Sequence, residues 1–440
     1  YCDFINNGKT ERECVAYGEK LAKAHGFEDL NAVVRSGRKL NAGARVYANW
    51  MGKSFMLFVL GEKPLEEGMN ILGAHIDSPR IDVKQNPLYE DTDLAYLDTH
   101  YYGGIKKYQW VAIPLALHGV IVRKTGEKVI INIGEDENDP VFCISDLLVH
   151  LAQEQMAKNA KEVVEGEALN LIVGGRPLEG EEKDAVKANV LKLLADKYGV
   201  EEEDFLSAEL EIVPAGKARD MGFDRSMILG YGHDDRVCAY PSMMAVLDYE
   251  GTPDYTLCCI VTDKEEIGSV GATGMASHYL ENTVAELYAC TADYCELAVR
   301  RCLRNSRMLS SDVSAGYDPN FASAFEKKNS AFLGRGICFN KFTGSRGKSG
   351  SNDANPEFMA SLRKIMDDAG VAFQTAELGR VDLGGGGTIA YLCAKYGMNV
   401  IDSGIPVLSM HAPYEIISKV DLYEGYRGYC AFLQGAKPVE

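Results

Sequence analysis

Histidine and carboxylate side chains directly follow several apolar, strand-like runs of this sequence. The segment ILGAHIDSPR (71–80) leaves such a run with His75 and, after one spacer residue, Asp77. The pattern suits a polar turn that closes a buried strand, and it also suits a metal ligand with the carboxylate that supports it. Because one His-x-Asp pattern is a weak signal, the other polar strand ends must decide between these two interpretations.

Four further segments present the same residue types at the end of an apolar run or the start of a helical pattern. They are YTLCCIVTDKEE (255–266), SRMLSSD (306–312), IPVLSMH (405–411) and YGHDDRVCAYPSMMAV (231–246). The candidate residues are, in chain order, His75, Asp234, Asp235, Glu265, Glu266, Asp312 and His411. Since ligands of open α/β sheets bind outside the carboxyl ends of the strands, these side chains are expected to converge on one edge of one sheet.

Each of these residues has an ordinary structural interpretation when it is taken alone. Glu265 and Glu266 suit a solvated turn, Asp234 suits a helix cap, and His411 suits a core imidazole. Several acids gathered beside two histidines would nevertheless repel one another, and burying a charge without a partner is costly. A pair of divalent cations removes that cost. A ligand set of imidazole and carboxylate without thiolate indicates zinc, cobalt or manganese.

Two such ions, about 3.5–4 Å apart, need a carboxylate that bridges them and further ligands on each side. A hydrolytic site also needs a base next to the attacking water. The adjacent acids Glu265 and Glu266 can supply one base and one ligand, because neighbouring residues leave the chain in different directions. The pattern therefore indicates metal-assisted hydrolysis.

The elements that must position these residues alternate between strand and helix in two parts of the chain. FMLFVLG (55–61) and GMNILGAH (68–75) read as buried strands, and KTERECVAYGEKLAKAHGF (9–27) reads as a helix with a capping box formed by Thr10 and Glu13. The alternation returns after residue 226. We expect residues 1–84 and 226–440 to form one discontinuous α/β domain, with a mostly parallel sheet and helices on both faces.

The intervening residues 85–225 have a different pattern and are expected to form an inserted, β-rich domain. They contain the β-like run WVAIPLALHGVIVRKTGEKVIINIG (110–134), in which TGE indicates a hairpin turn. They also contain SDLLVHLAQEQ (145–155), where three leucines are expected to form an apolar helical face, and a solvated helix over 179–199.

Composition excludes several classes of protein. The 440 residues carry a net charge of −18, with 64 acidic and 46 basic residues, which argues against a nucleic-acid-binding protein. The chain has no apolar run long enough for a membrane span, and YCDFINNGKT (1–10) does not resemble a signal peptide. Twelve cysteines without a Cys-x-x-Cys pair indicate a reduced, cytoplasmic protein.

Five motifs resemble those of the aspartyl aminopeptidase family, which belongs to the di-zinc exopeptidases. In chain order they are GAHIDSPR (73–80), HDDR (233–236), DKEEIGS (263–269), SSDVSAGYDPNF (310–321) and SMHAPYE (409–415). The resemblance spans nearly the whole chain. It implies a catalytic α/β domain interrupted by a dimerisation domain, which agrees with the insertion described above.

The resemblance also implies a role for each matching residue. His75 and Asp312 would be terminal ligands of one zinc ion, and Glu266 and His411 ligands of the other. Asp234 would bridge the two ions, because it aligns better than Asp235 with the aspartate of the family. The resemblance further implies that Glu265 is the general base and that Asp77 is the carboxylate supporting His75 and the base.

Substrate binding and assembly are implied by the same resemblance. In a chain of net charge −18, an acidic substrate side chain needs a positive partner, and NKFTGSRGKSG (340–350) offers Lys341, Arg346 and Lys348. The resemblance implies a pocket lysine in this segment, for which either Asn340 or Lys341 is the matching position. His150 of the inserted domain would reach the catalytic pocket of a neighbouring subunit, within dimers that assemble into a tetrahedral dodecamer. The family differs from this chain at YYGGIKKYQWVAIPLAL (101–117) and at DLGGGG (382–387), both in regions that could shape substrate specificity.

The sequence therefore predicts a metalloaminopeptidase that removes N-terminal residues, Asp or Glu among them, from peptides. Alternatives are a di-zinc aminopeptidase of neutral or basic preference, a metallo-carboxypeptidase or deacylase on the same sheet, and a metal-binding protein without turnover. Comparing the cleavage of Asp-, Glu-, Leu- and Lys-anilides distinguishes an acidic preference from a neutral or basic one. A substrate with a blocked N-terminus should be refused by an aminopeptidase and accepted by a carboxypeptidase or deacylase.

Overall fold

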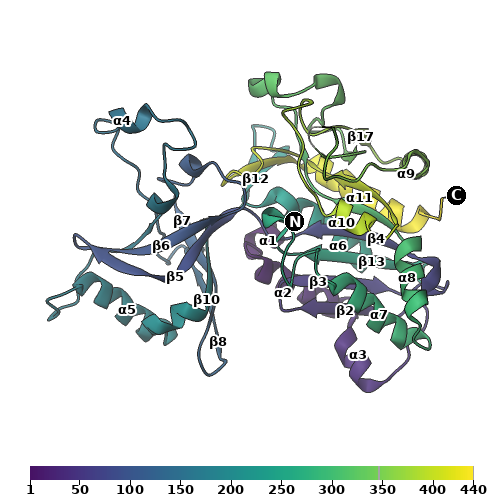
Figure 1. Cartoon of the computed structure of the whole chain (residues 1–440), viewed down its shortest axis with the longest axis horizontal. Helices are drawn as coiled ribbons and strands as arrows, with labels where there is room; N and C mark the ends of the chain where they lie inside the picture. Colours follow the sequence, from purple (N-terminus) through teal and green to yellow (C-terminus); the bar gives the residue numbers. More distant parts are fainter. Residues whose placement is uncertain (345–346, 440) are drawn as a thin grey trace. The chain divides into compact units, whose positions relative to one another are not determined.

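The computed structural model of the chain describes residues 1–344 and 347–439, and these form two compact units (Figure 1). The first unit contains residues 1–77, 219–410 and 415 to the end, and the second contains residues 78–218 and 411–414. Residues 78–218 of the second unit lie between two segments of the first unit, so the second unit is an insertion in the chain of the first. The sequence-based boundaries, 1–84 and 226–440 against 85–225, stay a prediction.

A nine-stranded sheet forms the centre of the first unit. Its strands, in spatial order, are β1 (Glu28–Asp29), β2 (Arg45–Trp50), β3 (Ser54–Val59), β13 (Thr256–Thr262), β4 (Met69–His75), β14 (Arg307–Ser311), β18 (Asn399–Gly404), β16 (Ile337–Asn340) and β17 (Phe373–Thr375). The four central strands β13, β4, β14 and β18 run parallel to one another. The mostly parallel sheet expected from the sequence is therefore confirmed.

The central strands form because their apolar runs are buried on both faces, as in other parallel sheets. Met69 and Ile71 of β4 point into an apolar cluster shared with β13 and with helices on one face. Asn70, between them, points to the other face and donates hydrogen bonds from Nδ2 to the carbonyl oxygens of Leu433 and Ala436. The alternation of side chains along β4 thus requires helices on both faces of the sheet.

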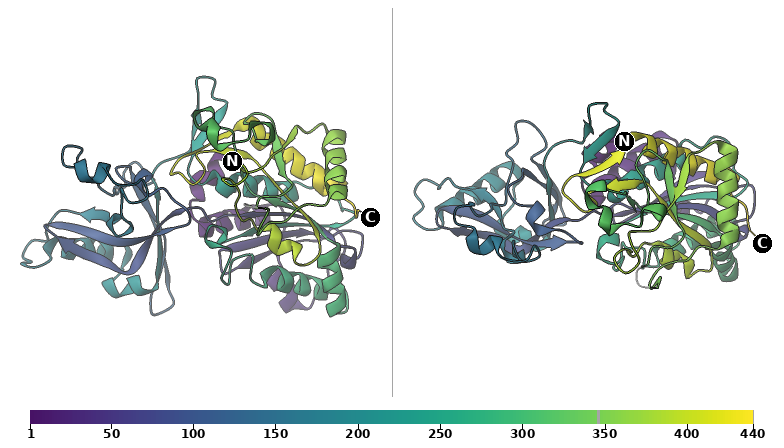
Figure 2. Two further views of the ribbon diagram at one scale, coloured as in Figure 1. Left: turned by 45° about the horizontal axis from the view of Figure 1, so that its top comes forward. Right: turned by 90° about the horizontal axis from the view of Figure 1, so that it is seen from above.

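Figure 2 shows these helices above and below the sheet. The apolar cluster includes residues of α3 (Leu30–Ser36), α7 (Tyr279–Thr291), α8 (Glu296–Asn305) and α10 (Ala390–Ala394). On the other face, α6 (His233–Leu247) and α11 (Lys419–Gly435) pack against each other and against β4. The first unit also contains α1 (Cys2–Asn7), α2 (Glu11–Ala24) and α9 (Pro356–Ala369). The capping box expected at the start of α2 is present, since Glu13 N–H donates to Thr10 Oγ1 at 3.2 Å and Thr10 N–H donates to Glu13 Oε2 at 3.1 Å.

Two smaller sheets complete the strands. In the first unit, a five-stranded sheet has the order β11 (Arg219–Met221), β12 (Met227–Gly230), β20 (Glu415–Ser418), β19 (Pro406–Leu408) and β15 (Ser314–Ala315). In the second unit, a six-stranded antiparallel sheet has the order β8 (Lys128–Ile133), β7 (Leu115–Val122), β10 (Ala208–Pro214), β5 (Arg80–Asp91), β6 (Leu94–Tyr102) and β9 (Leu171–Gly174). The expected TGE turn joins β7 and β8, with Gly126 at φ +87°.

Two helices of the second unit and several 3₁₀ segments make up the remaining regular structure of the described residues. The second unit contains α4 (Gln153–Met156) and α5 (Ala185–Tyr198). The 3₁₀ segments are η1 (Leu65–Glu67), η2 (Lys107–Gln109), η3 (Gly166–Ala168), η4 (Glu202–Ser207), η5 (Glu265–Ile267), η6 (Pro319–Ala324) and η7 (Lys327–Asn329). None of the helices within 1–344 and 347–439 combines the length and apolar character needed to cross a membrane.

The prediction of an apolar helical face over residues 145–155 is wrong, because the helix that forms in this region, α4, begins only at Gln153. Leu147, Leu148 and Leu151 are exposed, so packing against the core of the second unit does not stabilise a helix here. Asp146 Oδ1 accepts hydrogen bonds from the backbone N–H of Leu147 and from Gln155 Nε2. Such local side-chain bonds offer the backbone an alternative to the helix.

Candidate metal centre

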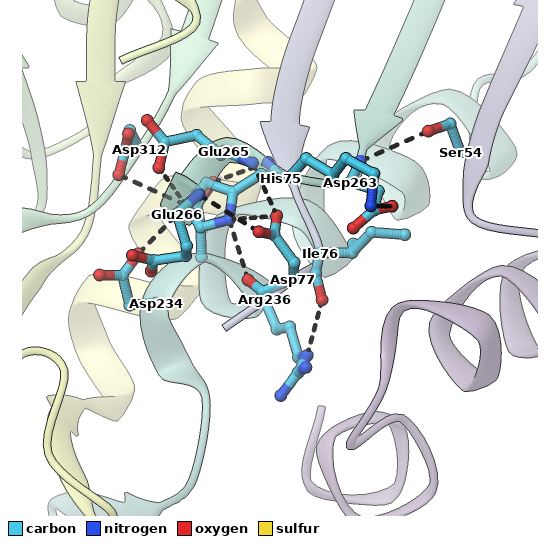
Figure 3. Close-up of polar contacts among 12 residues, drawn as sticks. Ser54, His75, Ile76, Asp77, Asp234, Arg236, Asp263, Glu265, Glu266 and Asp312 are labelled. Carbon is cyan, nitrogen blue, oxygen red and sulfur yellow. Dashed lines mark hydrogen bonds and ion pairs between the residues drawn. The ribbon is translucent and has the colours of Figure 1, made fainter. Parts of the chain in front are cut away.

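The candidate ligands of the first unit lie at the carboxyl ends of neighbouring strands, as expected. His75 ends β4, and the parallel register places it beside Thr262, the last residue of β13. Asp312 directly follows β14, in which Ser310 pairs with Gly73 of β4. Close packing fixes this register, since a Cβ at Gly73 would lie 2.1 Å from Met308 Cε. Figure 3 shows the side chains converging from these separate elements.

His75 is at the centre of the cluster, with its side chain almost completely buried. Its Nε2 lies 3.3 Å from Asp234 Oδ1, 3.9 Å from Glu265 Oε2 and 4.0 Å from Asp312 Oδ1. One donor atom from each residue lies within 4.8 Å of the other two in the triplets His75–Asp234–Asp312 and His75–Glu265–Glu266. An imidazole nitrogen and several carboxylate oxygens thus face one small volume.

Asp77 fixes the orientation of three members of the cluster. Its Oδ1 accepts the backbone N–H of Glu265 at 3.1 Å, and its Oδ2 accepts the backbone N–H of Glu266 at 3.2 Å. His75 Nδ1 lies 2.9 Å from the Asp77 carbonyl oxygen and 3.3 Å from its Oδ1. Because Nδ1 donates toward Asp77, Nε2 is left to face the carboxylates, which is the arrangement of a supported metal ligand.

The neighbouring acids Asp234 and Asp235 have different environments at the start of α6. Asp234 faces His75 Nε2, and its backbone N–H donates to Glu415 Oε2 at 3.0 Å. Asp235 Oδ2 instead accepts the backbone N–H of His75 at 3.3 Å. Gly232 precedes them in the left-handed conformation, with φ of +73°. Asp234 is therefore the member of this pair that points into the cluster.

The electrostatics of the cluster favour a bound cation. Burial raises the pKa of Asp312 well above its ordinary value, and the charges of Asp235 and Glu265 raise it further. Burial opposes the charged form of His75, but hydrogen bonds that its ring donates to Asp234 and Asp77 outweigh burial, so the pKa of His75 is raised well above its ordinary value. Acids that repel one another at this distance lose that penalty when divalent ions lie between them. The donor set, imidazole and carboxylate, fits zinc.

His411 begins the segment 411–414 that groups with the second unit. Its backbone has φ of +66°, and its Nδ1 lies 2.8 Å from the carbonyl oxygen of Gly104. This contact makes Nδ1 the donor and leaves Nε2 as the nitrogen able to bind a metal. The assignment of His411 to the metal centre stays a prediction.

The candidate substrate-binding residues lie outside the two triplets. Lys341 follows β16, and its Nζ lies 2.9 Å from Asp353 Oδ1, while Lys348 Nζ lies 2.9 Å from Asp353 Oδ2. One carboxylate thus holds both lysines. Arg346, the third basic candidate, lies outside the described residues. His150 is exposed in the second unit.

Sequence reasoning missed a buried acid near the cluster. Asp402 of β18 pairs in register with Ser310 of β14, and its Oδ1 accepts the hydroxyl of Thr388 at 2.6 Å. Burial raises the pKa of Asp402 to about 7, and the charge of Glu265 contributes to the increase. Asp402 follows the apolar run MNVI, so the rule that found His75 and Asp312 could also have found it.

Comparison with known proteins gives one consistent result. The model of the M18 family, described as aminopeptidase I zinc metalloprotease, matches residues 4–433. The probable M18 family aminopeptidase 1 of Clostridium acetobutylicum is 60% identical over 432 residues, covering 98% of this chain and 93% of that protein. The crystal structure of the M18 aminopeptidase of Thermotoga maritima has a TM-score of 0.94 at 43% identity, covering 99% and 95% of the two chains. The structure of the mApe1 dodecamer of S. cerevisiae has a TM-score of 0.77 at 21% identity, covering 98% and 94%.

Proposed function

The chain belongs to the M18 family of aminopeptidases, which are zinc metalloproteases, and we propose that it works through two zinc ions held at the cluster around His75. The observation that supports this most strongly is the position of Asp77. One carboxylate accepts the backbone N–H groups of both Glu265 and Glu266 and also faces His75. A single buried group therefore orients a ligand of each proposed ion and the proposed base.

In this proposal each ion has its own terminal ligands. His75 and Asp312 hold one ion and Asp234 bridges to the other, in keeping with the triplet His75–Asp234–Asp312. Glu266 is assigned to the second ion, and the family resemblance adds His411. The ions would polarise the scissile carbonyl and lower the pKa of the attacking water.

Glu265 is the proposed general base. Its Oε2 lies 3.9 Å from His75 Nε2, and its side chain is partly exposed to solvent. Its backbone is fixed by Asp77, so the carboxylate can vary its protonation while its position stays the same. Glu265 takes a proton from the attacking water and later passes it to the leaving amine.

Metal removal tests the proposal directly. Chelation should abolish hydrolysis of an N-terminally free peptide, and restoring zinc should recover it at close to two ions per chain. Cobalt and manganese serve as comparison ions, because the same donor set accepts them. Full activity in protein shown to be metal-free, or recovery that saturates at one ion, would contradict the two-ion centre.

The preference for acidic N-terminal residues is a finer part of the proposal. It needs a positive group in a chain with a net charge of −18, and Lys341 is the candidate. Asp353 already pairs with both Lys341 and Lys348, so an acidic substrate side chain must compete with that carboxylate. This pairing favours the alternative, a di-zinc aminopeptidase of neutral preference, which therefore stays open.

We also propose that the chain assembles into a homo-oligomer of dimers, up to a tetrahedral dodecamer. The S. cerevisiae mApe1 relative is a dodecamer. In this chain Leu147, Leu148, Leu151 and Met156 are exposed on one segment of the second unit, which suits a surface covered by another subunit. His150 lies within this segment and is the proposed contribution to a neighbouring active site.

The proposed location is the cytoplasm. All twelve cysteines are free thiols, and most of them are buried in apolar surroundings. Such usage is typical of a reducing compartment. The proposed partners are peptide substrates and copies of the same chain, without nucleic acid or membrane.

A further inference from the structure

A cavity of about 360 Å³ lies at the opposite end of the central strands from the metal centre. Arg307, the first residue of β14, pairs in register with Asn70 near the start of β4 and with Asn399 at the start of β18. His75 ends β4, five residues after Asn70, so the strand separates the two places by roughly 17 Å at ~3.3 Å per residue. The lining includes Glu67, Arg304, Asn305, Arg307, Asn399 and Val439.

Arg307 has an incomplete set of hydrogen-bond partners. Its side chain is almost fully buried, and its Nε donates to Asn70 Oδ1 at 2.8 Å. Neither Nη1 nor Nη2 has an acceptor among residues 1–344 and 347–439. The guanidinium carbon lies 4.3 Å from the centre of the Tyr255 ring, but that contact satisfies only the face of the group. The N–H bonds lie in the plane of the guanidinium and need acceptors there.

An unmatched charge of this kind is costly to bury. Burial lowers the pKa of Arg307 to about 10, so the group still carries its charge at neutral pH. No ion pair to Arg307 occurs in the part of the chain that the structure describes. Removing water from a charged donor without replacing its hydrogen bonds costs several times as much as for a neutral donor. Acceptors supplied from outside the described residues would remove this cost.

The surroundings of the cavity are positive, although the chain as a whole is acidic. Arg304, exposed in the last turn of α8, donates from its Nε to Asn305 Oδ1 at 3.3 Å. Lys63 Nζ lies 4.1 Å from the centre of the same Tyr255 ring. Glu67 is the acid of the lining, and its Oε2 lies 3.8 Å from Lys63 Nζ, so much of its charge is already compensated.

We propose that this cavity binds a small oxyanion, whose oxygens accept hydrogen bonds from the Nη groups of Arg307 and from Arg304. Phosphate and carboxylate groups both have this chemistry, and both match the paired N–H groups of a guanidinium. A cavity of about 360 Å³ is larger than a phosphate ion, so it also admits a phosphate or carboxylate carried by a small metabolite. The site is separate from the proposed peptidase centre and does not depend on it.

The test is a titration of the zinc-loaded full chain with inorganic phosphate, at constant ionic strength and with chloride as the comparison anion. Thermal unfolding and calorimetry measure the binding. We expect a saturable rise in Tm with phosphate, since a ligand that binds only the folded state stabilises it. Arg307→Gln and Arg304→Gln should each weaken the apparent affinity by about tenfold or more, the scale of a hydrogen bond to a charged group. Arg301→Gln, which removes an exposed charge from the same helix, is the matched control and should bind as the wild type does.

The two arginine variants also separate this site from phosphate bound at the zinc ions, because that binding would be equal in all variants. Acetate and citrate titrations then show whether carboxylates bind as phosphate does. If Arg307→Gln fails to fold, Arg304→Gln decides alone. A Tm that rises with neither phosphate nor the carboxylates would overturn the proposal. An equal rise in the wild type and in both arginine variants would also overturn it.

Discussion

Replacing Glu265 by glutamine separates proton transfer from metal binding. Glutamine has the same length as glutamate but does not accept a proton near neutral pH. The backbone N–H of residue 265 keeps its bond to Asp77 Oδ1, at 3.1 Å in the native protein, so η5 should keep its position. The triplet His75–Asp234–Asp312 does not include Glu265, so one proposed ion keeps all of these ligands.

The size of the expected effect follows from the role assigned to Glu265. General base catalysis contributes about 10²–10⁴ to a rate, so kcat should fall at least about 100-fold, or ~2.7 kcal/mol in activation free energy. KM should change little, because the substrate carbonyl and amine do not depend on this carboxylate for binding in the proposal. Zinc content should stay near that of the wild type.

The assay combines steady-state hydrolysis of Leu- and Asp-anilides with metal analysis of the same samples. Glu266→Gln is the matched control, because Asp77 holds its backbone N–H in the same way, at 3.2 Å. That variant should lose zinc, and added zinc should restore part of its activity. If Glu265→Gln kept more than about a tenth of the wild-type kcat with full zinc content, or lost zinc as Glu266→Gln does, the assigned roles would be wrong.

Three further predictions concern other residues. His150→Phe should lower kcat by roughly 100-fold with zinc and assembly retained, because in the proposal the imidazole of His150 donates a hydrogen bond to the developing oxyanion in the neighbouring site. Co-assembly with Glu265→Gln subunits should recover partial activity, and no recovery in demonstrably mixed assemblies would place His150 outside a neighbour's site. Lys341→Met should lower the ratio of Asp- to Leu-anilide cleavage, because an acidic substrate side chain that displaces Asp353 would lose its positive partner, and an unchanged ratio would support the neutral preference. Burial raises the pKa of Asp402 to about 7, whereas an aspartate in the unfolded chain titrates near ~4. Between these pH values the folded state keeps a proton on Asp402 that the unfolded state has lost. In chelated protein the free energy of unfolding should therefore fall as pH rises from about 4 to about 7. Asp402→Asn should flatten that part of the stability–pH curve, and urea titrations at several pH values that show the same slope in both proteins would contradict the assignment.

The parts of the fold that could be predicted from sequence are those in which a local pattern and tertiary burial agree. The run before His75 is buried on both faces, so its apolar character and its position in a parallel sheet give the same answer. The residues 145–155 show the opposite case. Their leucines at helical spacing predict an apolar helical face, but these leucines are exposed and do not pack against a core of the described unit. The backbone N–H of Leu147 instead donates a local hydrogen bond to Asp146 Oδ1.

The candidate site was predictable to the extent that each residue ends an apolar run. The two hydrogen bonds that consecutive backbone N–H groups donate to Asp77 could not be predicted, because they join residues separated by almost two hundred positions. Asp353 between Lys341 and Lys348 could not be foreseen either, since nothing in the sequence pairs one carboxylate with two lysines. Arg307 is a strand residue like many others until the fold places it against Tyr255.

The two ends of the segment 78–218, the longer of the two segments of the second unit, have unequal tolerance to insertions and deletions. The first lies between Asp77 and Ser78, where both residues are buried and the carboxylate that orients the proposed centre is the last residue before the crossing. The second lies between Ala218 and Arg219, on a partly exposed stretch that is separated from Asp234 by β11 and β12. Exposed junctions accept changes in length, whereas buried ones do not. We therefore expect a change of loop length or a domain graft to be tolerated at the second of these junctions, whereas a change at the first would alter the spacing between His75, Asp77 and β5.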